Sequence, residues 1–185
     1  GDQLIFVNDT VSIAGKKLDG TAIRKLFRGP ADSKVKVKFL RAGKMQEVTI
    51  TRGNIPVSSV DAAYMIAPKV GFIRLNKFAE RTYEEFMTEL EKLQAQKMQS
   101  LVLDLRGNTG GLMKEAVDMA DEFLGDNQLI VYTEGENTPR TEFKAKRPGL
   151  FEKGKLVVLI DESSASASEI LAGALQDWDR ATIMG

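Results

Sequence analysis

The sequence contains neither cysteine nor histidine. Without cysteine it cannot form a disulfide scaffold, a thiol nucleophile or a cysteine-ligated zinc site. Without histidine it cannot build a Ser-His-Asp triad or a histidine-ligated metal centre. Any nucleophilic chemistry must therefore use a base other than imidazole. Lysine is the leading substitute, because burial lowers its pKa toward neutrality.

Long apolar runs and an excess of one charge are also absent. No apolar stretch approaches the roughly 20 residues that span a bilayer. Lys plus Arg equal Asp plus Glu at 26 each, so the net charge favours neither nucleic acid nor an anionic membrane as a partner. We therefore expect no nucleic-acid partner, no integral membrane segment, no metal and no cofactor. The chain opens on Gly1 rather than Met, and we expect it to be part of a longer protein.

The N-terminal stretch, to about Arg52, has the pattern of a small β-rich module. Gln3–Val7 predicts a short strand, and Asp19 or Thr21 is placed to cap a short helix. Lys34–Leu40 alternates apolar and polar residues, and a turn at residues 42–43 leads into a return strand, which predicts a hairpin. Such a stretch has a thin core, so we expect part of a module rather than a whole one.

After a predicted connector over residues 54–68, strand patterns alternate with helix patterns. Thr82 begins a predicted helix with Glu85 at the capping-box spacing, and a second helix is predicted from about Leu112 to Leu124. The predicted strands are Val70–Leu75, Leu101–Leu105, Leu129–Tyr132 and Lys155–Ile160. This alternation predicts an α/β fold in which helices cover a sheet with parallel strands.

The apolar segment Lys155–Ile160 runs into a series of very small residues, 163–168, that opens a helix. Small side chains let a substrate backbone come close, and a helix N-terminus offers free N–H groups. A serine there can attack a carbonyl while the next N–H helps to hold the oxyanion. The alternative interpretation is that Ser164 or Ser166 merely caps the helix.

A second turn, Arg106–Gly111, follows the strand Leu101–Leu105 in the same way. Its paired glycines precede a helix and allow backbone N–H groups to face a ligand. The alternative is a tight strand-to-helix turn that requires positive φ. The turn matches neither the Gly-x-Gly-x-x-Gly nor the phosphate-loop pattern of nucleotide sites.

Taken together, the two turns resemble a known family. Residues 103–112, Leu-Asp-Leu-Arg-Gly-Asn-Thr-Gly-Gly-Leu, are similar to the Asp-Leu-Arg-Asn-Asn-Pro-Gly-Gly-Leu block of the carboxyl-terminal processing (tail-specific) serine peptidases, S41-type. Residues 164–170, Ser-Ala-Ser-Ala-Ser-Glu-Ile, resemble the nucleophile segment of that family, and residues 180–185 the strand after it. Gly1-Asp2-Gln3-Leu4-Ile5 resembles a segment inside the family's PDZ domain.

Carried over by position, this resemblance implies that Ser166 is the nucleophile. The Ala167 N–H would form the oxyanion hole together with an N–H from Gly110 or Gly111, and the sequence leaves the choice between the two glycines open. Other matched residues are expected to have packing, capping or structural roles: Ser164, Ser168, Glu169 and Asp104.

The resemblance also implies a general base. The family's base is a lysine in a Gly-Lys-Gly segment C-terminal to the nucleophile, a position that falls beyond Gly185. Lys153 and Lys155 do not match that motif. Because a serine without its base loses orders of magnitude in rate, we expect residues 1–185 alone to be inactive.

The implied architecture is a crotonase/ClpP-like core over residues 54–185, an α/β (α+β) sheet flanked by helices and truncated before the catalytic lysine. An incomplete PDZ domain over residues 1–53, lacking its N-terminal part, would precede it. Half of a tail-binding groove would then be absent, and an exposed sheet edge invites pairing with a second copy as a homo-oligomer.

The implied function is a serine endopeptidase that cleaves proteins near their C-termini through a Ser/Lys dyad and an acyl-enzyme. Its partners would be protein or peptide C-terminal tails, in the periplasm or cell envelope of a bacterium. The alternative is a non-proteolytic peptide- or ligand-binding domain on the same scaffold. A third interpretation, a crotonase-like acyl-transfer enzyme, is disfavoured by the PDZ-like N-terminal segment.

Overall fold

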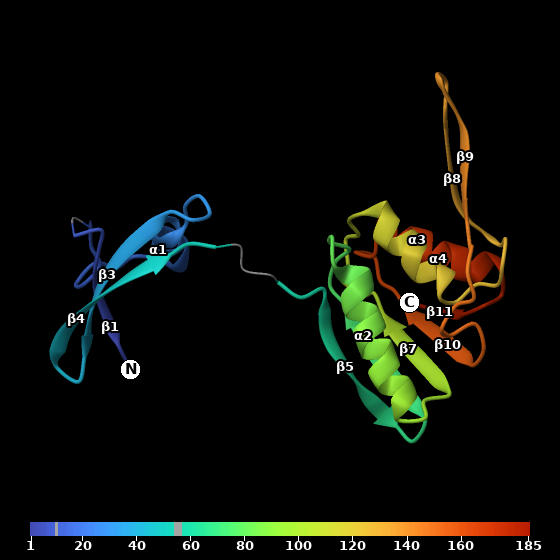
Figure 1. Cartoon of the computed structure of the whole chain (residues 1–185), viewed down its shortest axis with the longest axis horizontal. Coiled ribbons are helices and arrows are strands. Elements are labelled where there is room, and N and C mark those ends of the chain that lie inside the picture. Colours follow the sequence, from blue (N-terminus) through green and yellow to red (C-terminus); the bar gives the residue numbers. More distant parts are fainter. Residues whose placement is uncertain (10, 54–56) are drawn as a thin grey trace. The chain divides into compact units, whose positions relative to one another are not determined.

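The computed structural model of the chain describes residues 1–185 apart from residue 10 and residues 54–56. The chain divides into two compact units, Gly1–Val57 and Ser58–Gly185. Figure 1 shows the elements of each unit along the chain.

The first unit is a four-stranded antiparallel sheet in the order β2-β1-β3-β4, with one helix, α1 (Gly20–Phe27). The Asp19 carboxylate caps α1 by accepting the Ala22 N–H at 2.6 Å, as predicted. The strands are β1 (Gln3–Val7), β2 (Val11–Ser12), β3 (Lys34–Arg41) and β4 (Lys44–Thr51). The predicted hairpin is confirmed as β3 and β4. Its buried core is small and consists of three valines: Val7, Val35 and Val37.

The second unit contains a five-stranded sheet in the order β11-β10-β7-β6-β5. The strands β6, β7, β10 and β11 are parallel, and β5 pairs antiparallel at the edge. Their bounds are β5 (Val60–Ala67), β6 (Val70–Leu75), β7 (Ser100–Asp104), β10 (Lys155–Leu159) and β11 (Thr182–Met184). The predicted sheet with parallel strands is thereby confirmed.

Three helices complete the second unit: α2 (Thr82–Ala95), α3 (Met113–Asp121) and α4 (Ala167–Asp177). The parallel strands follow one another across the sheet in chain order, so right-handed crossovers place these helices on the same face. Alternate strand residues on that face are fully buried against the helices, among them Ile73, Leu75, Leu103 and Val158. The carboxyl ends of the parallel strands all lie at one edge, and the two turns singled out from the sequence leave the sheet there.

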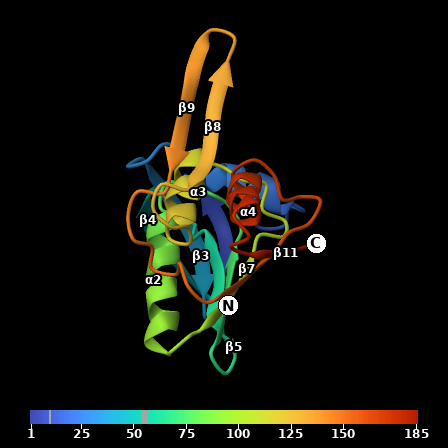
Figure 2. The same cartoon turned by 90° about the vertical axis from the view of Figure 1, so that its right-hand side faces the viewer.

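A two-stranded hairpin, β8 (Leu129–Gly135) and β9 (Thr138–Lys144), projects away from the rest of the second unit (Figure 2). The strand predicted at Leu129–Tyr132 is therefore present but belongs to this hairpin and not to the main sheet. The indole N–H of Trp178 donates to Leu129 O at 2.8 Å and ties the base of the hairpin to the end of α4.

The predicted connector over residues 54–68 is wrong in its second part. Residues 54–56 lie outside the described residues, but Val60–Ala67 forms the edge strand β5. Pro68 directly follows the strand and does not interrupt it. Register shifts along its pairing with β6 disturb the apolar–polar alternation that would have identified the strand.

The predicted capping box at the start of α2 is also wrong, although the helix does begin at Thr82. The Glu85 carboxylate turns away to accept the Ser59 N–H at 2.6 Å and the Ser58 hydroxyl at 3.0 Å. The Thr82 hydroxyl accepts the Ala79 N–H at 2.8 Å. Tertiary contacts with the start of β5 have replaced the local pair. Among the described residues, no helix is long and apolar enough to cross a membrane.

Candidate active site

Ser166 lies immediately before α4, in a backbone conformation that L-residues rarely adopt. Its φ is 55° and its ψ is −113°. Such a conformation costs about 1–3 kcal/mol and persists only where the surroundings impose it. The Ser166 N–H donates to the Glu169 carboxylate at 2.6 Å, which fixes the turn from inside the first turn of the helix. The residue itself is exposed, so a strained turn presents a serine to solvent at a helix N-terminus.

The two turns predicted to form the site touch each other. A Cβ added to Gly110 would stand 2.5 Å from Ala165 O, 2.8 Å from Ser166 Cβ and 2.9 Å from Ala167 N. Only a residue without a side chain allows this approach. The structure therefore brings together all four residues that the sequence singled out, since Gly111 directly follows Gly110.

The amides of Gly110 and Gly111 differ in their partners. The Gly110 N–H donates to Asn108 Oδ1 at 2.9 Å. Phe78 N donates to Gly110 O at 2.9 Å and Leu112 N to Phe78 O at 2.8 Å. In this parallel bridge the N–H of Gly111 points away from Phe78, and no acceptor for it is found among the described residues.

The N–H of Ala167, like that of Gly111, lacks a hydrogen-bond acceptor in the described part of the chain. Ala167 is the first residue of α4 and has no acceptor within the helix, and the described part of the chain supplies none elsewhere. Two backbone N–H groups, one on each turn, therefore have no acceptor among the described residues. The positive potential of a helix N-terminus favours negative charge at such a place.

Two residues that sequence reasoning did not single out hold these turns. Asn108 accepts the Gly110 N–H, and Asp161 accepts the Ser163 N–H at 3.0 Å. Both are Asx turns, in which a side chain accepts the N–H two residues further along. Asp161 also accepts the Gly107 N–H at 2.9 Å, a bond that lowers the pKa of this carboxyl from its ordinary value by more than burial raises it. The sequence signal that could have identified both residues is an Asn or Asp that follows a buried strand and lies two residues before a glycine or serine of the turn.

The flanking serines have structural contacts. The Ser164 hydroxyl donates to Leu105 O at 2.8 Å, and the buried Ser168 hydroxyl donates to Asn108 O at 2.9 Å. Both bonds join the turn of the predicted nucleophile, residues 163–168 (the nucleophile turn), to the glycine turn, residues 106–111, or to the strand before it. Neither hydroxyl is available for chemistry.

Asp104 at the end of β7 is fully buried and bound by Arg106, with N–O distances of 2.9 and 2.8 Å, and by Arg74 at 3.5 Å. Burial raises the pKa of Asp104, but the hydrogen bonds and charge of Arg106 outweigh it, so that the net pKa is lowered. This geometry gives Asp104 a structural role in fixing the start of the glycine turn.

Replacement of Asp104 by asparagine is expected to lower the free energy of unfolding by about 1–2 kcal/mol at pH 7, since both arginines are half exposed and screened. A carboxyl with a lowered folded pKa stabilises the fold above its unfolded pKa and loses that contribution as the pH falls through the folded value. Urea unfolding of both proteins at pH 7 and pH 3 should show the difference shrinking at pH 3. An equal difference at both pH values would contradict the ionic role.

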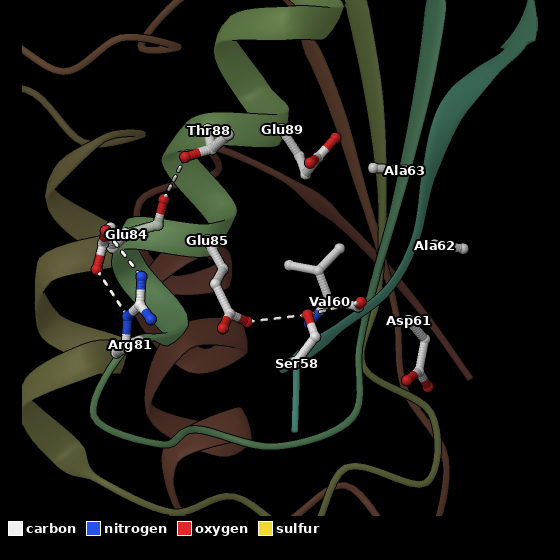
Figure 3. Close-up of a pocket in the computed structure, with 10 residues that line it drawn as sticks. All are labelled: Ser58, Val60, Asp61, Ala62, Ala63, Arg81, Glu84, Glu85, Thr88 and Glu89. Atoms are coloured by element: carbon white, nitrogen blue, oxygen red, sulfur yellow. Dashed lines mark hydrogen bonds and ion pairs between the residues drawn. The ribbon is translucent and has the colours of Figure 1, made fainter. Parts of the chain in front are cut away.

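No lysine of the described part of the chain is hydrogen-bonded to Ser166. No group of three acidic residues in that part is arranged to hold a metal ion. A cleft of about 310 Å³ does lie between β5 and α2, lined by acidic side chains such as Glu85 and Glu89 (Figure 3). None of its lining residues belongs to the two turns. The chemistry available at the turns is therefore that of a serine hydroxyl beside two backbone donors.

Comparison with known proteins identifies the family to which the chain belongs. The sequence profile of Peptidase family S41 matches residues 69–185, which is more than half of the chain and includes both turns. The chain belongs to peptidase family S41. The two turns of this S41 peptidase domain lie within the matched region.

Individual relatives extend the match to the first unit. A carboxyl-terminal-processing protease of Synechocystis sp. is 39% identical over 189 residues, which cover all of this chain and 43% of the relative. A carboxy-terminal-processing protease of Bartonella bacilliformis is 34% identical over 191 residues, covering 98% of this chain and 44% of the relative. The S41 chain thus spans less than half the length of these curated relatives.

Among solved structures, the photosystem II D1 C-terminal processing protease superposes with a TM-score of 0.62 at 29% sequence identity. The match covers 99% of this chain and 50% of that one. The mixed α/β architecture of the S41 chain therefore resembles that of a C-terminal processing protease.

Proposed function

We propose that the protein is a serine endopeptidase that cleaves protein substrates near their C-termini, with Ser166 as the nucleophile. The observation that carries this proposal is the pairing of an exposed serine in a strained turn with two unoccupied backbone donors, Ala167 N–H and Gly111 N–H. Capping alone does not require a strained backbone or a second turn in contact with the first. Membership of family S41 and the names of the relatives support the same reaction.

In the proposed reaction the Ser166 hydroxyl attacks the scissile carbonyl carbon and its proton passes to a general base. The carbonyl oxygen becomes an oxyanion, held by the N–H groups of Ala167 and Gly111. Collapse of the tetrahedral intermediate breaks the C–N bond, and the leaving amine takes the proton as the C-terminal piece departs. Water then hydrolyses the acyl-enzyme and restores Ser166. Gly110 is proposed as the residue of close approach rather than a donor, because its N–H is held by Asn108.

We assign the general base to a lysine, which forms a Ser/Lys dyad with Ser166. Residues 1–185 contain no histidine, and lysine is the base that the family resemblance implies. The resemblance places that lysine in a Gly-Lys-Gly segment C-terminal to the nucleophile. Residues 1–185 expressed alone are therefore expected to acylate slowly, because none of their described lysines contacts Ser166.

The first unit supports substrate selection in this proposal. We assign residues 1–53 to a partial PDZ-like module and residues 54–185 to the peptidase core. The substrates proposed are protein or peptide C-terminal tails, and the setting is the bacterial cell envelope, by analogy with the bacterial relatives. Pairing with a second copy through an exposed sheet edge remains a prediction.

The proposal is tested with the full-length protein and an unfolded reporter protein that ends in either apolar or charged residues. We expect cleavage near the C-terminus, about tenfold faster for the apolar ending. Mass spectrometry after treatment with a fluorophosphonate should find the phosphonyl adduct on Ser166. An adduct at another residue would overturn the assignment of the nucleophile. Reporter binding without any cleavage would favour the alternative of a non-proteolytic binding domain.

A further inference from the structure

We propose that Asn108 is a positioning residue that sets the spacing between the two oxyanion donors. This inference rests on the proposed function of the site. Asn108 touches neither the substrate nor the reacting atoms in this assignment. It acts through the two turns that carry Gly111 and Ala167.

The Asn108 side chain is fully buried and uses both ends of its amide. Its Oδ1 accepts the Gly110 N–H at 2.9 Å, and its Nδ2 donates to Leu75 O at 3.1 Å. The orientation of the amide is fixed by its partners, because a backbone N–H can only donate and a carbonyl can only accept. The glycine turn is thereby attached to the end of β6.

The main chain of the same residue holds the nucleophile turn. Asn108 O accepts the Ala165 N–H at 3.2 Å and the Ser168 hydroxyl at 2.9 Å. These two donors flank Ser166 and Ala167 on either side. One buried residue thus fixes the glycine turn through its side chain and the nucleophile turn through its carbonyl.

The consequence concerns the transition state more than the bound substrate. The two donors must converge on an oxygen that becomes negative only during the reaction. A displacement of about 1 Å at such a site costs on the order of 100-fold in rate. Loss of the Asn108 side-chain bonds should therefore lower kcat and leave KM nearly unchanged.

Asn108→Asp is the informative substitution, because it keeps the size of the side chain. An ionised carboxylate still accepts the Gly110 N–H but places an acceptor against Leu75 O. A protonated carboxyl has one donor and one acceptor, like the amide it replaces. We expect kcat to fall 10- to 100-fold at pH 8 and to recover toward the wild-type value as the pH is lowered, since burial favours the neutral form.

Other charged groups near the two turns are Asp104 at the end of β7, Arg106 on the glycine turn, Asp161 and Glu162 directly before the nucleophile turn, Glu169 on α4 and Arg74 on β6. All are present in the wild type and in a matched control, Asn76→Asp. Asn76 is half exposed and donates to Ser58 O and Asp61. A pH response confined to Asn108→Asp therefore reports the introduced buried carboxyl.

The test measures the full-length wild type, Asn108→Asp, Asn108→Leu and Asn76→Asp in two ways. Amide hydrogen exchange should quicken over residues 107–112 and 163–168 in both Asn108 variants at pH 8, and only Asn108→Asp should regain protection at low pH. Peptide cleavage should show the fall in kcat at constant KM. Unchanged exchange in both turns, or wild-type kcat in both Asn108 variants, would overturn the inference.

The exchange measurement separates this inference from the proposed function. If the wild type cleaves no reporter but both turns loosen in the Asn108 variants, the positioning role stands and the peptidase assignment fails. If the wild type cleaves and the variants match it at every pH, the peptidase assignment stands and the positioning role fails.

Discussion

Replacement of Ser166 by alanine is expected to abolish cleavage, with kcat/KM lowered by at least about 1000-fold. In the proposed mechanism the Ser166 hydroxyl is the protein group that forms the covalent bond to the substrate. The fold should be retained, because Ser166 is exposed and its N–H still bonds to Glu169, so that the variant loses only the capping contact of the hydroxyl with the first turn of α4, about 1 kcal/mol. Cleavage of the reporter by the full-length proteins, followed by electrophoresis, measures the loss. Undiminished cleavage by Ser166→Ala would place the nucleophile elsewhere.

Two further variants of the same turn separate chemistry from backbone strain. Ser163→Ala, at an exposed serine three residues earlier, should cleave like the wild type. Ser166→Gly should be as inactive as Ser166→Ala but about 1 kcal/mol more stable than it, because glycine adopts positive φ without the strain that alanine retains. Chemical unfolding of the two inactive variants gives this difference. A Ser166→Gly variant less stable than Ser166→Ala would indicate that the turn is relaxed.

The sequence alone was sufficient to locate both turns of the site, because each follows a buried apolar strand and precedes a helix. In a parallel sheet such turns must meet at the carboxyl edge of the strands. It was not sufficient to choose between Gly110 and Gly111 as a donor. That choice depends on where each N–H points, which is set by Asn108 and by the bridge to Phe78, and Phe78 lies far from the turn in sequence.

The misjudged elements share a physical cause. β5 carries register shifts that mask its period, and it is recognised only by its pairing with β6. Glu85 has the spacing of a capping residue but finds a better partner in the Ser59 N–H, from a segment remote in sequence. The hairpin strand Leu129–Gly135 has the composition of a sheet strand, yet among the described residues it pairs with β9 alone. In each case the local sequence pattern is present, but a contact with a segment remote in sequence decides which structure forms.

Replacement of Gly110 by alanine adds a single methyl group, and we expect it to lower both the stability of the protein and its activity strongly. The residue has φ of +94°, and the new Cβ would lie 2.5 Å from Ala165 O and 2.9 Å from Ala167 N, which are backbone atoms of the nucleophile turn. Strain and overpacking together should cost about 2–5 kcal/mol of unfolding free energy. If the turns separate to relieve the contact, the two oxyanion donors no longer converge, and we expect kcat to fall at least about 100-fold.

Gly107→Ala provides the matched control for this last change. Gly107 also has positive φ, +73°, and lies on the same turn, but a Cβ there meets no atom within 4 Å. The Gly107→Ala variant should lose only about 1–2 kcal/mol of unfolding free energy, the cost of a left-handed alanine, and it should keep most of its activity. Thermal unfolding and reporter cleavage of both variants compare them directly. If Gly107→Ala were as inactive as Gly110→Ala, flexibility of the turn would matter to the reaction, and the close approach of Gly110 to Ser166 would not explain the loss.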